Sequence, residues 1–460
     1  MSWSVAELAR FCGGRVSGSP DVVVESVSTD TRTLGRGALF VAVRGETHDG
    51  HDHAADALAR GAVALLVSRV PEATLRAPAI IVDDTVAALG RLAREHRARF
   101  SGPVIAITGS NGKTTTKELC ARVLEAAGRR VRRTPGNLNN HIGLPLSVLA
   151  LDPADEVLVV ELGMNHEGEI DHLARIAVPT VGAITNIAPA HLGPLGSLAA
   201  IARAKGELYA RIRPDGVAVV NADDSNCVAQ SDRFAGQKLR FAAAADADVR
   251  ARAIASEAGA ARYTLECPLG RTEIRMRVPG MHLVEDGLCA AAAAFASGVL
   301  GKTAVQAIRS GLESFAGVPG RAALRENFDG LRLLDDTYNA NPHSVARALE
   351  TLSALRGDGQ AIAVLGDMLE LGDAAARLHA EIGRKVAAAG VGVLVAVGPL
   401  SRDTAQAARE AGIGTVLECD DPDTAAELVR KHARPGDVVL VKASRGMRLE
   451  RVVARLLEPR

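Results

Sequence analysis

The chain has 460 residues, and at roughly 150 residues per domain this length predicts about three domains. Hydrophobic residues make up 47% and charged residues 23%, as in ordinary globular proteins that bury several cores. The 54 basic and 54 acidic residues cancel, which argues against a nucleic-acid coat or a polybasic membrane binder. The six scattered cysteines, the lack of an apolar run of about 18 residues and the absence of a signal-peptide pattern favour a cytoplasmic protein.

Short apolar runs alternate with Ala-rich helical stretches, a pattern typical of α/β domains with parallel sheets. Strands are predicted at residues 104–108, 157–161, 181–187, 217–221, 331–335, 361–365, 391–397 and 438–441. Helices are predicted at residues 115–127 and 198–212, and residues 241–278 are expected to be rich in strands and turns.

Two breaks rich in Gly and Pro divide the chain, at residues 100–103 and 315–320. They predict an N-terminal domain at 1–100, a central domain at 101–316 and a C-terminal domain at 317–460.

The strongest chemical signal follows the strand at residues 104–108 and reads Thr108-Gly109-Ser110-Asn111-Gly112-Lys113-Thr114-Thr115. Glycines let backbone N–H groups curl around phosphate oxygens, and the N-terminus of the following helix adds partial positive charge. Lys113 can reach terminal phosphates, and the Thr114 hydroxyl can ligate Mg²⁺. Ile107 replaces the first glycine of the usual P-loop pattern, which points away from common GTPases and kinases. The alternative is a plain strand-to-helix turn with a solvated lysine.

Three further side chains are candidates for the same sheet edge. Glu161 ends a predicted buried strand, where ligands of open α/β sheets collect, and its carboxylate can hold Mg²⁺. His191 follows the next strand. Taken alone, each has a structural alternative: an exposed strand-end Glu161, a structural His191 and a helix-surface Lys205.

Together with Asn137-Leu138-Asn139-Asn140-His141-Ile142-Gly143, these segments resemble the Mur ligase family in order and spacing. That family contains the ATP-dependent, amide-forming enzymes of peptidoglycan precursor synthesis. Further segments resemble the branch that adds D-alanyl-D-alanine: Thr29-Asp30-Thr31-Arg32, Leu39-Phe40-Val41-Ala42, and residues 335–342, 365–372 and 442–447. The Asp-Asn-Pro-Arg motif of the branch that adds diaminopimelate or lysine is absent from the sequence.

The resemblance implies an α/β fold of three domains. They are an N-terminal domain for the UDP-substrate, a central P-loop-type ATPase domain with a parallel sheet, and a Rossmann-like C-terminal domain. The implied reaction uses ATP to convert the carboxylate of UDP-N-acetylmuramoyl-tripeptide into an acyl phosphate. D-alanyl-D-alanine then captures this intermediate and gives the pentapeptide. The resemblance also implies two Mg²⁺ ions and a Lys205 carbamylated by CO₂. A monomer that binds these small molecules, and neither nucleic acid nor membrane, is expected.

The resemblance also assigns residues. Catalytic roles are expected for Lys113, Glu161, His191 and Lys205, and metal ligation for Thr114, Glu161, His191 and Lys205. ATP contacts are expected for Gly109, Ser110, Asn111, Gly112, Lys113, Thr114, Thr115, Asp286, Arg321, Asp336, Tyr338 and Asn341. Contacts with the UDP-substrate are expected for Ser28, Asp30, Arg32, Asn139 and Asn140.

Residues 279–287 depart from the family's pattern, which has asparagines where this chain has Leu283 and Asp286. Leu283 cannot make an amide contact with a base, and Asp286 is expected to offer an acceptor in place of a donor. Ala443 replaces a usual glycine. Two rival functions are a folylpolyglutamate-synthase-like ligase and a nucleotide-dependent scaffold that has lost catalysis. The 29–32 and 335–342 segments disfavour the first, whereas the substitutions at Leu283 and Asp286 leave room for the second.

Overall fold

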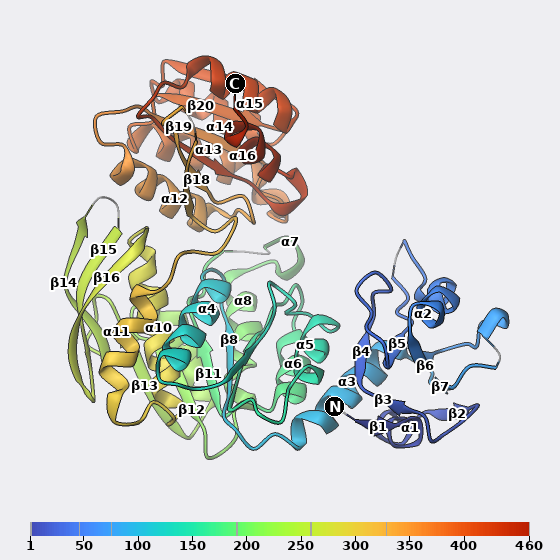
Figure 1. Ribbon diagram of the computed structural model, residues 1–460. Helices are drawn as coiled ribbons and strands as arrows, with labels where there is room; N and C mark the ends of the chain where they lie inside the picture. Colours follow the sequence, from blue (N-terminus) through green and yellow to red (C-terminus); the bar gives the residue numbers. More distant parts are fainter. Residues whose placement is uncertain are drawn as a thin grey trace.

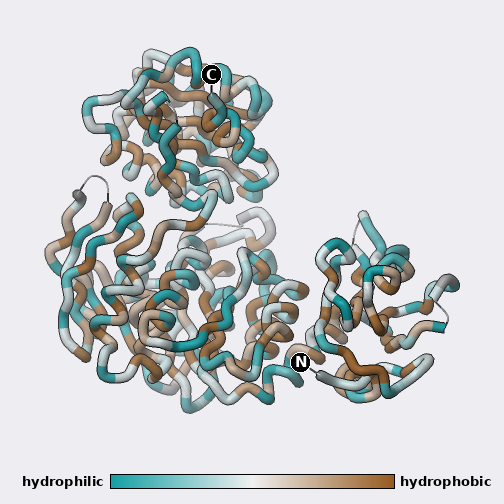
Figure 2. Tube along the Cα trace, viewed as in Figure 1, coloured by the Kyte–Doolittle hydropathy of each residue, from teal (hydrophilic) through white to brown (hydrophobic). Residues whose placement is uncertain are grey.

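The computed structural model describes residues 2–45, 47–74, 76–189, 192–257, 260–327 and 329–459. Three large sheets follow one another along the chain and form three units, coloured blue, cyan through green to yellow, and orange to red in Figure 1. Figure 2 shows that the hydrophobic segments of each unit concentrate on its inner strands and helices. Within the described ranges, every helix is too short or too polar to cross a bilayer.

The first unit contains a five-stranded sheet in the order β2-β7-β6-β5-β4, which is parallel except for the antiparallel β2–β7 pair. Its strands are β2 (Arg15–Ser17), β4 (Ser26–Ser28), β5 (Ala38–Val41), β6 (Ala62–Val67) and β7 (Ala79–Ile81), and β1 (Trp3–Ser4) pairs with β3 (Val23–Val24). Its helices are α1 (Val5–Cys12), α2 (Ala54–Ala59) and α3 (Thr85–Ala98).

Helix α3 joins the first unit to the second, and one buried side chain fixes the junction. The Arg97 guanidinium donates to the carbonyl oxygens of Ala177 (2.8 Å), Val178 (3.1 Å) and Phe100 (2.7 Å). These contacts tie the end of α3 to the end of a helix in the second unit, so the first unit is anchored to the unit that carries the phosphate loop.

The second unit contains a nine-stranded sheet in the order β16-β15-β14-β13-β12-β11-β8-β10-β9. Strands β8 to β14 are parallel, and β14, β15 and β16 pair antiparallel at one edge. The strands are β8 (Val104–Thr108), β9 (Val131–Arg133), β10 (Val157–Glu161), β11 (Val181–Ile184), β12 (Val217–Asn221), β13 (Gln237–Ala242), β14 (Val249–Glu257), β15 (Ala260–Cys267) and β16 (Gly270–Pro279). The helices are α4 (Lys113–Ala126), α5 (Gly143–Leu149), α6 (Glu169–Ala177), α7 (Leu192–Leu195), α8 (Leu198–Gly206), α9 (Ser225–Gln230), α10 (His282–Ala296) and α11 (Ala304–Glu313).

Strand β8 shows why these apolar runs form buried strands. Successive side chains of a strand point to opposite faces, so β8 can contribute to two cores. Val104 and Ala106 pack into the core that contains α3, α5, α6 and α8, whereas Ile105 and Ile107 pack into the core that contains α4, α10 and α11. Helices therefore cover both faces of the sheet, and its strand ends are the natural place for a ligand.

The third unit contains a six-stranded sheet in the order β17-β18-β22-β19-β20-β21, parallel except for the β17–β18 pair. Its strands are β17 (Ala323–Glu326), β18 (Arg332–Asp335), β19 (Ala361–Gly366), β20 (Val393–Val397), β21 (Thr415–Cys419) and β22 (Val438–Lys442). Its helices are α12 (Pro342–Leu355), α13 (Ala375–Ala388), α14 (Ser401–Glu410), α15 (Pro422–His432) and α16 (Glu450–Leu457).

Most predicted elements are confirmed, and two differ for physical reasons. The strand predicted at 181–187 ends at Ile184, because Thr185 and Asn186 leave the sheet and hydrogen-bond the loop after β8. The helix predicted at 198–212 ends at Gly206 and is followed by a short 3₁₀ turn, Tyr209–Arg211. Residues 241–278 form the predicted strand-rich region, which includes β14 to β16.

Candidate active site

The loop between β8 and α4 has a backbone that glycines alone accommodate. Gly109 has φ 150° and Gly112 has φ 80°. A Cβ atom on Gly109 would lie 1.8 Å from Thr185 Oγ1, and one on Gly112 would lie 2.1 Å from Asp286 Oδ1. Both glycines of the predicted phosphate loop are therefore needed for their backbone conformation and for the close approach of neighbouring side chains.

The residues after β11 hold this loop in place through hydrogen bonds. The Ser110 N–H donates to the Asn186 carbonyl oxygen (2.8 Å), and the Asn111 N–H donates to Asn186 Oδ1 (3.1 Å). The Thr185 hydroxyl donates to the Asn111 carbonyl oxygen (2.6 Å). The backbone N–H groups of residues 110 and 111 are thus already hydrogen-bonded within the protein. Helix α4 begins without a side-chain cap, so its first-turn N–H groups are the donors left for a phosphate.

Two lysines converge on one backbone carbonyl of the loop. Lys113 Nζ donates to the Gly109 oxygen (2.8 Å) and to the Ser110 oxygen (3.2 Å), and Lys205 Nζ donates to the same Gly109 oxygen (2.8 Å). Burial lowers the pKa of Lys113 to about 8. Burial, and next the charge of Lys113, lower the pKa of Lys205 well below its ordinary value, which favours its neutral amine.

Glu161 ends β10 beside these lysines and is fully buried. Its Oε2 accepts from the Thr114 hydroxyl (2.8 Å), and its Oε1 accepts from Asn139 Nδ2 (2.8 Å). A carboxylate and a hydroxyl in contact provide the oxygen ligands that Mg²⁺ prefers. Lys205 donates to the Gly109 carbonyl oxygen of the adjoining loop. The Glu161 carboxylate and the Thr114 hydroxyl therefore provide oxygen ligands that fit the expected Mg²⁺.

His191, the remaining predicted metal ligand, lies outside the described residues. Among the residues that the structure does describe, no group of three or more His, Cys, Asp or Glu side chains gathers at one point. The fit to Mg²⁺ therefore depends on Glu161, on the Thr114 hydroxyl, and on the oxygens that a carbamate on Lys205 would add.

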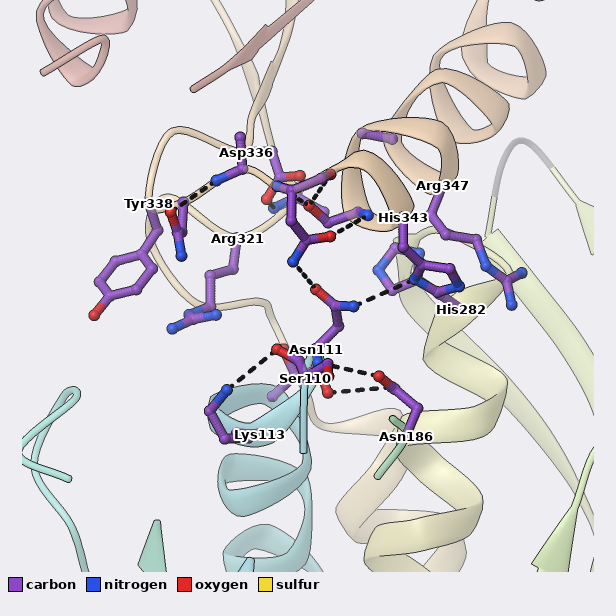
Figure 3. A pocket seen from close by; sticks show the side chains of 18 of the residues that line it. Ser110, Asn111, Lys113, Asn186, His282, Arg321, Asp336, Tyr338, His343 and Arg347 are labelled. Carbon is purple, nitrogen blue, oxygen red and sulfur yellow. Dashed lines mark hydrogen bonds between the residues drawn. The ribbon is translucent and has the colours of Figure 1, made fainter. Parts of the chain in front are cut away.

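A cavity of about 330 Å³ opens between the second and third units, at the carboxyl ends of their strands (Figure 3). Most of the predicted ATP-binding and catalytic residues line it: Ser110, Asn111, Gly112, Lys113, Thr115, Glu161, Lys205, Asp286, Arg321, Asp336, Tyr338 and Asn341. Asn139, which was predicted to contact the UDP-substrate, lines it as well. Residues far apart in sequence are thus brought to one site that combines the phosphate loop with the third unit.

The third unit presents an arginine, a tyrosine and an ion pair to this cavity. The Arg321 guanidinium carbon lies 4.0 Å from the Tyr338 ring centroid (Figure 3). The Asp336 carboxylate accepts from Lys442 Nζ (2.6 Å) and from the Ala322 N–H (3.2 Å). Lys442 is 2% exposed and ends β22, one residue beyond the strand predicted at 438–441, and the sequence gave it no predicted role.

Hydrogen bonds and an ion pair join the second unit to helix α12. Asn341 caps α12, and its Nδ2 donates to Asn111 Oδ1 (2.7 Å). Asn111 Nδ2 also lies 3.3 Å from His343 Nδ1, and Figure 3 shows this chain of contacts above the loop. Arg347 donates to the Glu285 carboxylate (2.7 Å). The predicted loop residue Asn111 therefore contacts the third unit directly.

The two positions that depart from the family's pattern lie on α10. Leu283 is 2% exposed and packs into the second unit's core, so it makes an apolar contact only. Asp286 is buried, and its Oδ1 lies 3.4 Å from the Thr116 hydroxyl. Burial, and next the neighbouring Glu285, raise the pKa of Asp286 to about 8. The raised pKa favours the protonated carboxyl, which carries a donor as well as an acceptor, as an amide does.

His282 is a cavity-lining residue that the sequence analysis passed over. Its Nδ1 is buried and, within the described ranges, has no hydrogen-bond partner. Burial lowers its pKa to about 4, so the imidazole is neutral at physiological pH. It starts α10 and, as Figure 3 shows, lies beside His343 and Arg347.

The residues predicted to bind the UDP-substrate divide into two groups. Ser28, Asp30 and Arg32 lie at the end of β4, outside the cavity; Ser28 and Asp30 are half-buried and Arg32 is exposed. The Asp30 carboxylate accepts from the Arg32 N–H and guanidinium, which lower the pKa of Asp30 to about 2. Asn139 contacts Glu161, and Asn140 Oδ1 accepts from the Gly143 N–H (2.9 Å) at the start of α5. Both asparagines line a second cavity of about 350 Å³.

Family models match three parts of this chain. Residues 107–294 match the Mur ligase middle domain, and residues 320–445 match the Mur ligase glutamate ligase domain. Residues 23–97 match the Mur ligase family catalytic domain. The chain is also 36% identical to the UDP-N-acetylmuramoyl-tripeptide--D-alanyl-D-alanine ligase of Escherichia coli K12, over 100% of this chain and 99% of that protein.

Solved structures give the same relationship. The fold superposes on a crystal structure of MurF from Acinetobacter baumannii with a TM-score of 0.90, 32% identity and coverage of 100% of this chain and 99% of that one. It also superposes on the crystal structure of MurF ligase from Thermotoga maritima in complex with ADP, with a TM-score of 0.82 and 30% identity. That match covers 94% of this chain and 97% of the other. The α/β fold of three domains that the sequence predicted is confirmed.

The geometry at Gly112 predicts that Gly112→Ala weakens nucleotide binding. The new Cβ atom would displace the Asp286 carboxyl or the loop, and roughly 1–3 kcal/mol of such strain corresponds to about 5- to 150-fold in affinity. ADP binding followed by titration calorimetry measures this loss.

Gly128→Ala is the matched control. Gly128 has a similar φ of 77°, but a Cβ atom there meets nothing within 4 Å. We expect this variant to lose stability only and to bind ADP normally. Equal ADP affinity in the two variants would contradict the steric role of Gly112.

Proposed function

Because this chain belongs to the Mur ligase family, we propose that it joins D-alanyl-D-alanine to UDP-N-acetylmuramoyl-tripeptide with the cleavage of ATP. The observation that carries this proposal is similarity over the full length to proteins named for that reaction. The cavity supports it, because a phosphate loop, a buried carboxylate and a lysine whose pKa is lowered by burial meet there. The product would be the UDP-linked pentapeptide used in peptidoglycan synthesis.

The three units would then divide the substrates. Residues 1–100 would bind the UDP end, with Ser28, Asp30 and Arg32 at the end of β4. Residues 101–316 would hold ATP and the muropeptide carboxylate, with Asn139 and Asn140 facing the muropeptide. Residues 317–460 would close the cavity over the nucleotide. The structural match to the ADP-bound MurF ligase of Thermotoga maritima covers 94% of this chain and 97% of that one. This similarity supports the proposal that the cavity binds the nucleotide.

In this proposal ATP binds across the cavity between the second and third units. The first-turn N–H groups of α4 and the Lys113 ammonium contact the β- and γ-phosphates. Arg321, which stacks on Tyr338, adds a positive charge beside the phosphates. Asp336 and Asn341 line the nucleoside side, and the protonated Asp286 presents a donor and an acceptor to the base.

We propose that Thr114 and Glu161 hold one Mg²⁺ and that His191 and a carbamylated Lys205 hold a second. When bound, the ions would neutralise the charge of the transferring phosphoryl group. The buried environment of Lys205 supports the carbamate, because only a neutral amine attacks CO₂. Carbamylation replaces the buried amine of Lys205 with an anion beside Lys113. The attraction between this anion and the Lys113 ammonium would stabilise the carbamate.

The chemistry of the carboxylate explains why catalysis depends mainly on how the reactants are positioned. A carboxylate is a poor acylating agent, because its charge repels a nucleophile and oxide is a poor leaving group. Transfer of the γ-phosphoryl group from ATP to a carboxylate oxygen gives an acyl phosphate and ADP. The neutral amine of D-alanyl-D-alanine then forms the C–N bond, the C–O bond to phosphate breaks, and one amine proton is released. The chain's own groups bring the anionic reactants together and exclude water from the intermediate.

The rival functions make different predictions about turnover. A folylpolyglutamate-synthase-like ligase would not use a UDP-muropeptide, and a scaffold that has lost catalysis would bind nucleotide without releasing phosphate. The named relatives favour neither rival.

An acceptor assay tests the proposed function. Phosphate release is measured with matched UDP-peptides and each of four acceptors: D-alanyl-D-alanine, diaminopimelate, lysine and glutamate. We expect turnover only with UDP-N-acetylmuramoyl-tripeptide and D-alanyl-D-alanine together. Lys113→Ala is expected to lower the rate by about 10²–10³-fold, as loss of a preorganised charge does. Nucleotide binding without phosphate release in the wild-type chain would contradict the proposal.

The state of Lys205 can be measured directly. In ¹³C-bicarbonate we expect one carbamate resonance in the wild-type protein that is absent from Lys205→Ala. Lys238→Ala is the control, because Lys238 lies on the surface in an ion pair with Asp232. A spectrum of Lys205→Ala that retains the same resonance would contradict the assignment.

A further inference from the structure

Helix α4 contains a second buried lysine, which the proposed chemistry does not use. Lys117 lies one helical turn after Lys113, and none of its surface is exposed to solvent. Moving an ammonium group from water into the protein interior is costly unless hydrogen bonds and an opposite charge compensate for it. The reason for a buried charge in the helix that follows the phosphate loop must therefore lie in its partners.

Three acceptors engage the three N–H donors of this ammonium group. Lys117 Nζ donates to the carbonyl oxygens of Thr134 (2.7 Å) and Gly136 (2.8 Å), and it lies 3.0 Å from the Glu118 carboxylate. Both carbonyls belong to residues 134–139, the segment that follows β9. The ammonium of Lys117 is therefore used to join α4 to this segment.

The 134–139 segment in turn contacts the carboxylate at the end of β10. The Glu161 N–H donates to Thr134 Oγ1 (3.1 Å), and Asn139 Nδ2 donates to Glu161 Oε1 (2.8 Å). The Asn139 carbonyl oxygen accepts from the Gly163 N–H (2.9 Å). The segment is thus attached at three points to the end of β10 and to the residues that follow it.

The two oxygens of the Glu161 carboxylate have partners on different elements. Thr114, in the first turn of α4, donates to Oε2, whereas Asn139 donates to Oε1. Because Lys117 ties α4 to the segment that contains Asn139, it fixes the spacing between these two donors. The fit is close, since a Cβ atom on Gly163 would lie 2.6 Å from Asn139 Oδ1. A shift of the segment would therefore move Asn139 together with the carboxylate that it holds.

We propose that Lys117 is a positioning residue that acts through Asn139 to orient the Glu161 carboxylate for a metal ion. It does so by fixing the 134–139 segment against the helix that carries Thr114. The assignment rests on the Mg²⁺ site of the proposed function. It explains why an ammonium group is buried far from any phosphate contact of its own: the charge holds two parts of the metal site in register.

The test measures metal binding directly, with Mn²⁺ in place of Mg²⁺. The affinity of Mn²⁺ for the ADP complex is followed by the paramagnetic resonance signal of the free ion. Lys117→Met keeps a long unbranched side chain but removes the ammonium group. We expect it to weaken Mn²⁺ binding about tenfold, as the loss of a group that orients a metal ligand does. The affinity for ADP without metal should change less than about twofold, because Lys113 and the first turn of α4 remain.

A double-mutant cycle tests whether the effect passes through Asn139. Asn139→Ala alone should also weaken Mn²⁺ binding about tenfold. Residues that act through one another are not additive, so Lys117→Met should weaken Mn²⁺ binding less than about twofold further in the Asn139→Ala background. A double variant about 100-fold weaker than the wild type would show two independent effects and would overturn the proposed route.

Arg97→Met is the matched control. Like Lys117, Arg97 is a buried cation that donates to carbonyl oxygens. Its partners Ala177 and Val178 precede β11, however, and lie at the opposite edge of the parallel sheet from Glu161. This variant should lose stability in thermal unfolding and keep its Mn²⁺ affinity within about twofold of the wild type.

The outcomes separate this role from the function on which it rests. A folded Lys117→Met protein that binds Mn²⁺ as tightly as Arg97→Met does would overturn the positioning role. If Lys117→Met does not fold, Lys117→Gln, which keeps an N–H donor, is judged by the same comparison. A wild-type ADP complex that binds no Mn²⁺ would overturn the proposed metal site and the positioning role with it. Intact Mn²⁺ binding without turnover of D-alanyl-D-alanine would overturn the proposed function alone.

Discussion

The shared carbonyl of Gly109 is the point on which the site depends. Two lysine ammonium groups cannot both remain charged at one buried oxygen without a compensating anion, and burial disfavours the charge of Lys205 more strongly. One lysine can therefore serve as a phosphate-binding cation, while the other is held as an amine. One backbone carbonyl thus holds two lysines of different pKa in the cavity that Glu161 also lines.

The cavity exists only where two units meet. The second unit supplies the loop, Glu161 and Lys205, and the third supplies Arg321, Tyr338 and the Asp336–Lys442 pair. Among the described residues, polar contacts cross this boundary: Asn341 and His343 with Asn111, Arg347 with Glu285, and the Glu370 carbonyl with Gly193. Polar contacts of this kind are individually weak.

Local sequence was sufficient to predict the parts of the site that depend on local chemistry. The glycines around the phosphate loop, the carboxylate at the end of β10 and the Asn-Pro start of α12 each carry their signal in a few neighbouring residues. Sequence did not predict Asn186 as the support of the loop or Lys442 as the partner of Asp336, because each pair is separated by 75 or more residues. The raised pKa of Asp286 was not predicted either, since it follows from burial rather than from residue type.

The account claims that the muropeptide's carboxylate becomes a mixed anhydride with phosphate before the amide bond forms. The most direct measurement labels that terminal carboxylate with oxygen-18 and follows the label by mass spectrometry during turnover with ATP and D-alanyl-D-alanine. The account predicts one labelled oxygen in the orthophosphate for each amide bond formed. Orthophosphate that contains no label while the pentapeptide accumulates would contradict it.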